Sequence, residues 1–124
     1  MKRQQQFSCQ RDGLTIRGYL YGDTSAPQEA VILSHGFLAN QSTTIPYAKL
    51  IAELGFVAFT FDFCGGGIGS KSDGKSVDMT VLTEMEDLKA VYQYVSAQPF
   101  VTGVSLLGCS QGGFVSAMVA RGLG

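Results

Sequence analysis

The residues with the clearest chemical meaning are Gly108-Cys109-Ser110-Gln111-Gly112, which match the pattern G-x-S-x-G. In this pattern a serine occupies a sharp turn between a strand and a helix, and small glycines let the backbone turn without clashes. The context fits, because the apolar run 101–107 precedes the motif and the segment 114–120 has helical character. We therefore predict that Ser110 is a nucleophile, supported structurally by Gly108, Gly112 and Gly113. An ordinary strand–helix turn is the alternative interpretation.

A nucleophilic serine also needs donors for the oxyanion that forms during acyl transfer. The backbone N–H of Gln111 lies at a predicted helix N-terminus, where free N–H groups favour negative charge. The second donor should come from the loop after an earlier strand. That loop contains His35-Gly36-Phe37, in which Gly36 allows a close backbone approach and Phe37 offers its N–H. We therefore predict that Phe37 and Gln111 form the oxyanion hole.

The pattern of apolar residues predicts the elements that position these groups. Alternating strands and helices after a leading hairpin imply an α/β fold with a mostly parallel sheet and helices on both faces. Residues 44–54 form a helix with an apolar stripe of Tyr47, Leu50, Ile51 and Leu54. The other predicted elements are strands over 4–11, 14–21, 30–33, 56–61 and 101–107, and a helix over 80–97.

Composition narrows the class of partner and the compartment. The chain has 124 residues, 45% of them hydrophobic, and a formal net charge of -1. A chain with so little net charge has no strong electrostatic field that would attract nucleic acid or an anionic membrane, so we expect neither as a partner. Three cysteines without a C-x-x-C pair form neither a disulfide framework nor a zinc site, which is typical of a cytoplasmic protein.

The sequence resembles the α/β-hydrolases, in particular the branch with cinnamoyl and feruloyl esterases, monoglyceride lipase-like enzymes and serine aminopeptidase-like hydrolases. The resemblance implies hydrolysis of a small-molecule carboxylic ester through an acyl-enzyme on Ser110, with no cofactor and no metal. An amidase or aminopeptidase-like activity is the alternative. Cys109 stands where the family often has histidine, and Gly69 where it usually has serine. The matching pieces are Ser34-His35-Gly36-Phe37, Phe61-Asp62-Phe63-Cys64-Gly65-Gly66-Gly67, Asp78-Met79-Thr80-Val81-Leu82-Thr83-Glu84 and Gly108-Cys109-Ser110-Gln111-Gly112-Gly113.

The family's triad runs along the chain as serine, then acid, then histidine. No Asp, Glu or His follows Ser110, and His35 precedes it in the oxyanion loop, where we expect a structural role. The resemblance then implies that residues 1–124 are the N-terminal part of a single domain, truncated after the elbow helix, without the cap, acid and base. We expect negligible turnover, and self-association through the open strand edge at 101–107.

Two other hypotheses remain open. Residues Gly69 to Ser76 fit G-x-x-x-x-G-K-S, the phosphate-binding P-loop. The context disfavours it, because a P-loop follows its strand directly and Asp73 would place a negative charge in the phosphate cradle. The chain could also be a non-catalytic fragment or interaction module that keeps the elbow without a proton acceptor.

Overall fold

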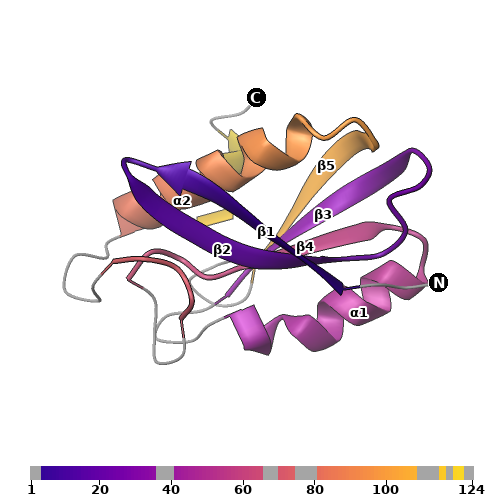
Figure 1. Cartoon of the computed structure of the whole chain (residues 1–124), viewed down its shortest axis with the longest axis horizontal. Helices are drawn as coiled ribbons and strands as arrows, with labels where there is room; N and C mark the ends of the chain where they lie inside the picture. The colour runs from indigo at the N-terminus through magenta and orange to yellow at the C-terminus, as the bar shows by residue number, and fades with distance from the viewer. Residues whose placement is uncertain are drawn as a thin grey trace.

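The computed structural model describes residues 4–35, 41–65, 70–74, 81–108, 115–116 and 119–121. Over these residues five strands form one mixed sheet, in the order β1-β2-β4-β3-β5 (Figure 1). The strands are β1 (Gln4–Arg11), β2 (Leu14–Tyr21), β3 (Gln28–Ser34), β4 (Val57–Phe61) and β5 (Val101–Gly108), and the helices are η1 (Gln41–Thr43), α1 (Ile45–Glu53) and α2 (Val81–Ser96).

The leading hairpin supplies the antiparallel part of the sheet. Asp12 and Gly13 both have positive φ, 51° and 80°, as the tight turns of two-residue hairpins require. β2 then pairs antiparallel with β4, whereas β3 pairs parallel with both β4 and β5. The α/β architecture is therefore confirmed, and its parallel character lies in the three strands β4, β3 and β5.

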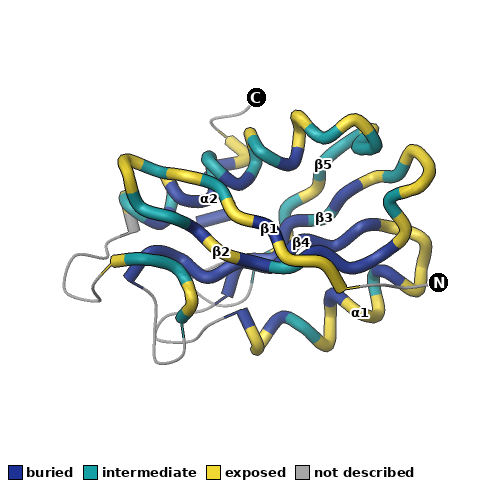
Figure 2. Tube along the Cα trace, viewed as in Figure 1, coloured by how far each residue is buried: buried dark blue, intermediate teal, exposed yellow. Residues whose placement is uncertain are grey.

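The two longer helices cover opposite faces of the sheet (Figure 1). α1 packs on β4 and β2, and α2 packs on β1, β3 and β5. Each face has its own apolar cluster: Phe59, Leu88 and Val95 belong to the α2 side, whereas Leu33 and Ala48 belong to the α1 side. Helices on both faces, as predicted, leave the central strands β3 and β4 largely buried (Figure 2).

The apolar stripe predicted for the helix over 44–54 is wrong for three of its four residues, since only Ile51 packs against the core. Tyr47, Leu50 and Leu54 are 54%, 57% and 69% exposed, and the buried residues of α1 are Ala48 and Ala52. Small side chains on a helix let it approach the sheet closely. The space between the helix and the sheet is then filled by larger side chains from the strands. The periodicity of the helix was therefore visible in the sequence, but the face it buries was not.

Gly18 lets β2 lie close to its neighbour β4. A Cβ atom at this position would be 2.0 Å from the Thr60 carbonyl oxygen and 2.7 Å from the Phe7 ring. No side chain fits in that space, so the glycine is required for the hairpin to close against β4.

Candidate functional site

The strand that precedes His35-Gly36-Phe37 and the strand that precedes Ser110 end next to each other. β3 and β5 are parallel neighbours, and Ser34 at the end of β3 is paired with Gly108 at the end of β5. The chain therefore leaves both strands from the same edge of the sheet, toward His35 on one side and Cys109 on the other. This edge, at the carboxyl ends of the strands, is where α/β sheets bind their ligands.

Most of the predicted site residues lie outside the described part of the chain. Gly108 is described and is the last residue of β5, so the strand runs one residue beyond the predicted range 101–107 and ends at the first residue of the G-x-S-x-G motif. The predictions for the others rest on the sequence alone; these residues are Ser110, Gln111, Gly36, Phe37, Gly112 and Gly113.

The chain is helical again soon after the motif. Residues 115–116 and 119–121 are helical, and Val115 and Val119 are completely buried in the same cluster as α2 and β4. The Ser116 hydroxyl donates to the Ser34 hydroxyl at 3.5 Å, so this helical segment lies beside the end of β3. Strand β5 before the motif and helix after it are the context that a nucleophile elbow requires.

His35 has the structural environment that we expected. Its side chain is 1% exposed, and Nε2 accepts a hydrogen bond from the backbone N–H of Phe63 at 3.1 Å. The Phe63 ring packs edge-on against the imidazole, with 4.8 Å between ring centroids. An Nε2 that accepts from an amide is not free to take a proton from a serine, so His35 joins the end of β3 to the residues after β4.

The next anchor is Asp62, which directly follows β4 and is 1% exposed. Its carboxylate accepts from the Gln41 backbone N–H at 2.7 Å, the Gln41 side-chain amide at 2.9 Å and the Lys71 N–H at 2.9 Å. The Gln41 amide oxygen in turn accepts from the Thr60 hydroxyl at 2.8 Å. Hydrogen bonds to an ionised carboxylate are stronger than neutral ones, and here they replace the water that burial has removed.

His35 and Gln41 flank the segment that contains the predicted donor Phe37. The first is held by Phe63 and the second by Asp62, so two consecutive residues after β4 fix both sides of that segment. In the sequence, Asp62 stands out only as part of a segment that resembles the α/β-hydrolases, and nothing in the pattern singles out Gln41. Neither could have been paired from the sequence, because they are 21 residues apart and no periodic pattern connects them.

A second buried carboxylate links the hairpin to α2. Asp87 is completely buried, accepts from Arg11 Nε at 2.7 Å and accepts from the Cys64 N–H at 2.8 Å. Burial raises the pKa of Asp87 above its usual range, although the guanidinium of Arg11 and the amide of Cys64 pull that pKa down. The carboxylate therefore connects α2 to β1 and to the loop after β4.

The cysteines that the structure describes are free thiols. Burial, reinforced by the charge of Asp87, raises the pKa of Cys9 to about 11 and the pKa of Cys64 to about 12. Such thiols stay protonated at neutral pH and are poor nucleophiles. Within the described ranges, no group of three or more His, Cys, Asp and Glu side chains could hold a metal ion.

The structure gives the P-loop hypothesis no support in the part of Gly69 to Ser76 that it describes. Residues 70–74 lie along β2, where the Ser72 hydroxyl accepts from the Arg17 N–H at 2.8 Å. Asp73 accepts from the Thr15 N–H at 3.1 Å and from Arg17 Nη1 at 2.7 Å. These side chains are bonded to the backbone of β2 and to the Arg17 guanidinium, so they do not form a cradle around a phosphate.

Among the described helices, none combines the length and the apolar character that a membrane crossing needs. No protein-family model matches the sequence, and no curated protein matches it either. Solved structures do match.

Three examples are each more than a quarter identical to the chain. Est1E from Butyrivibrio proteoclasticus, solved with ferulic acid bound, is 27% identical with a TM-score of 0.85, over 94% of this chain and 47% of that one. The α/β hydrolase GrgF from Penicillium sp. sh18 is 29% identical with a TM-score of 0.82, over 97% and 41%. DcsB, solved with a substrate analogue, is 29% identical with a TM-score of 0.83, over 95% and 41%. The chain thus spans less than half the length of each.

Proposed function

This chain has the fold of the α/β-hydrolases, and we propose that it carries the nucleophile and oxyanion hole of a serine hydrolase that cleaves a carboxylic ester. The observation that carries the proposal is the pairing of Ser34 with Gly108. It brings the strand before the HGF loop and the strand before the G-x-S-x-G motif to one edge of the sheet, as acyl transfer at Ser110 requires.

In the proposed reaction the Ser110 hydroxyl attacks the ester carbonyl, and the N–H groups of Phe37 and Gln111 stabilise the resulting oxyanion. Collapse of this intermediate releases the alcohol and leaves an acyl-enzyme, which water then hydrolyses to the acid. A small acyl or aromatic ester is the substrate class that we propose. The similarity to Est1E, whose structure contains ferulic acid, supports this class. An amide substrate remains the alternative.

The reaction needs a base that takes the proton of the serine. Within the 124 residues, no Asp, Glu or His follows Ser110, and the imidazole of His35 is engaged with Phe63. We propose that residues 1–124 are the N-terminal part of a single hydrolase domain whose acid and histidine lie outside this sequence. Loss of the base alone costs on the order of 10⁶ in kcat in serine proteases, so these 124 residues alone should have negligible turnover.

The test compares this chain with the longest product of its gene on short-chain aryl esters. If that product extends past Gly124 and supplies the acid and histidine, it should hydrolyse them, and Ser110→Ala should abolish the activity. The matched control is Ser116→Ala, which removes a buried serine six residues further along the chain and should leave turnover nearly unchanged. Hydrolysis by an extended Ser110→Ala protein at the wild-type rate would refute the assignment of the nucleophile. If residues 1–124 alone hydrolysed the esters at an ordinary enzyme rate, the proposal that the catalytic base lies outside this sequence would be refuted.

The compartment is part of the same proposal. We propose a cytoplasmic protein, supported by the free thiols of Cys9 and Cys64.

A further inference from the structure

The outer side of α1 carries apolar residues that nothing in the described part of the chain covers. Tyr47 and Leu50 of α1 and its C-cap residue Leu54 are all more than half exposed. Their spacing of three and four residues places them on one side of the helix, and we call these three residues the outer stripe. Figure 2 shows exposed positions along the side of α1 that points away from the sheet.

The outer stripe is a concentrated apolar surface. Of the six large apolar residues that are exposed in the described ranges, four lie between Tyr47 and Phe56. Single exposed apolar residues are ordinary on a protein surface, whereas apolar residues that gather on one surface mark a place where another surface binds.

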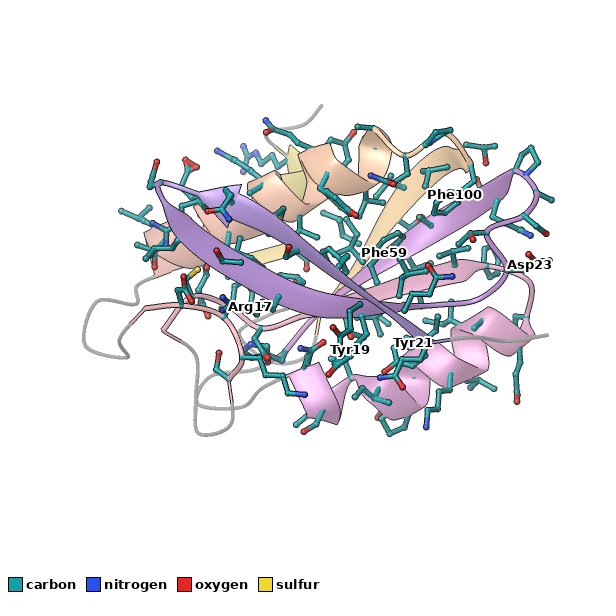
Figure 3. All side chains as sticks on the ribbon, in the orientation of Figure 1. Arg17, Tyr19, Tyr21, Asp23, Phe59 and Phe100 are labelled. Carbon is teal, nitrogen blue, oxygen red and sulfur yellow. The ribbon has the colours of Figure 1, made fainter. Side chains whose placement is uncertain are left out.

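The opposite side of α1 is already packed on the sheet. Ala48 and Ala52 belong to the same core cluster as Tyr21 of β2, with Tyr19 packed against that cluster. Figure 3 shows Tyr19 and Tyr21 between β2 and α1. Rotating the helix to bury the outer stripe would replace the small alanines by large side chains in a filled space, which is costly. Cover for the outer stripe must therefore come from another surface.

Two opposite charges lie along one border of the outer stripe. Lys49 and Glu53 are both exposed and four residues apart, so they follow each other along the same side of α1. Neither forms an ion pair with another described residue. Lysine four residues before glutamate is the less favourable order for a pair within one helix. Both charges can therefore pair with charges on another surface.

We propose that the outer stripe is the contact surface of a symmetric dimer, in which α1 packs antiparallel against α1 of a second copy of this chain. A two-fold axis brings the same border of both helices together in opposite directions, so Lys49 of each copy faces Glu53 of the other. The midpoint between Lys49 and Glu53 is position 51, and the midpoint between Tyr47 and Leu54 lies between positions 50 and 51. One axis therefore matches both the charges and the apolar residues.

The length and charge of α1 define the kind of association. Its nine residues span about 14 Å, so the contact is smaller than the roughly 1,600 Å² buried in a standard protein–protein interface. We therefore expect a reversible dimer that forms as the concentration rises. One positive and one negative charge along the border favour a copy of the same helix over an anionic lipid surface, which attracts cations only.

Sedimentation equilibrium of the 124-residue chain tests the proposal. The measurements use the Leu107→Lys background, so that the open edge of β5 does not contribute to association. The average mass should rise with concentration, and Leu50→Lys should weaken the dimer about tenfold or more, because a two-fold interface loses each contact twice. The matched control is Leu82→Lys, which introduces the same charge at an exposed leucine of α2 and should leave the dissociation constant unchanged.

The two charges allow a second test that does not alter the apolar residues. Lys49→Glu places a second glutamate opposite Glu53 in its own dimer, and Glu53→Lys places two lysines opposite each other. Each variant alone should therefore associate more weakly than the parent chain. An equimolar mixture should form a heterodimer, because both pairs then have opposite charges again. Both positions are exposed, so the variants should fold, which circular dichroism checks.

The outcome is independent of the proposed hydrolase activity, since Ser110→Ala should dimerise as the parent chain does. The proposal is overturned if the Leu107→Lys chain is monomeric at all concentrations, or if Leu50→Lys and Leu82→Lys have equal effects. It is also overturned if the mixed charge variants associate no better than each alone. The longest product of the gene should dimerise as well; a monomeric product would show that the rest of the domain covers the outer stripe, and would likewise overturn the proposal.

Discussion

Two consecutive residues after β4 organise the proposed active-site edge, one through its carboxylate and the other through its backbone N–H. Asp62 and Phe63 together hold Gln41 and His35, which flank the segment with the predicted oxyanion donor Phe37. An oxyanion hole stabilises a transition state only when its donors are fixed in advance. The buried carboxylate of Asp62 therefore matters to the proposed chemistry through position rather than through contact with the substrate.

Asp62→Asn tests this arrangement, because it keeps the shape of the side chain and removes its charge. One oxygen that now accepts a hydrogen bond would become an NH₂ group facing another donor. We expect a loss of about 2–4 kcal/mol in the free energy of unfolding, measured by urea denaturation, since a buried donor would be left unsatisfied. Asp12→Asn, at an exposed turn with positive φ, is the control and should change stability by less than about 0.5 kcal/mol. Equal effects of the two substitutions would contradict the role of Asp62.

At the scale of elements, a buried ion pair connects the hairpin to helix α2. Arg11 of β1 and Asp87 of α2 form an ion pair at 2.7 Å, with the Arg11 side chain 16% exposed and that of Asp87 completely buried. Breaking such a pair costs more than forming it gains, because one charge stays buried without its partner.

Arg11→Gln should therefore lower the free energy of unfolding at neutral pH by about 3 kcal/mol. Burial already raises the pKa of Asp87, and loss of the cation raises it further. A raised carboxyl pKa means that the folded protein binds the proton more tightly, so acid favours folding in that pH range. The deficit of the variant should shrink as the pH falls through the pKa of Asp87. Unfolding curves at several pH values measure this. Lys89→Gln, at a surface pair of α2, should show no such trend.

The contact between β2 and β4 depends on one glycine. Gly18→Ala would place a Cβ 2.0 Å from the Thr60 carbonyl oxygen, and the backbone of a central strand cannot move away to make room. We expect a loss of about 3 kcal/mol or more, or failure to fold, as for other overpacked sites. Gly103→Ala in β5 is the comparison, because its Cβ would meet only the flexible end of Glu29 at 3.3 Å. Thermal melting followed by circular dichroism should separate the two; similar melting temperatures would contradict this account of Gly18.

For the whole molecule, the exposed surface predicts how the chain associates. β5 is the last strand in the described sheet, and Leu107 on it is 41% exposed. An open edge can pair with another chain, and a lysine on it discourages such pairing. Leu107→Lys should therefore shift the sedimentation coefficient toward that of the monomer. Leu82→Lys changes a 72% exposed leucine on α2 and should not. A wild-type chain that stays monomeric at high concentration would refute this expectation.

The sequence by itself determined the order of the elements, the hairpin turn and, to within one residue, the end of β5. These depend on local rules: the positive φ that Asp12 and Gly13 supply, the apolar run over 101–107, and the glycines around it. The serine assignment also stays a sequence prediction, since Ser110 lies outside the described residues.

Only the tertiary structure decided which surfaces meet. The strand order, the buried alanine face of α1, the pairing of Gln41 with Asp62 and the ion pair of Arg11 with Asp87 join residues that are distant along the chain. Periodicity shows that a helix has faces, but which face is buried depends on the volume of the side chains opposite it. Similarly, a polar residue in a loop gives no sign of its partner, because the partner is brought to it by the folding of the whole sheet.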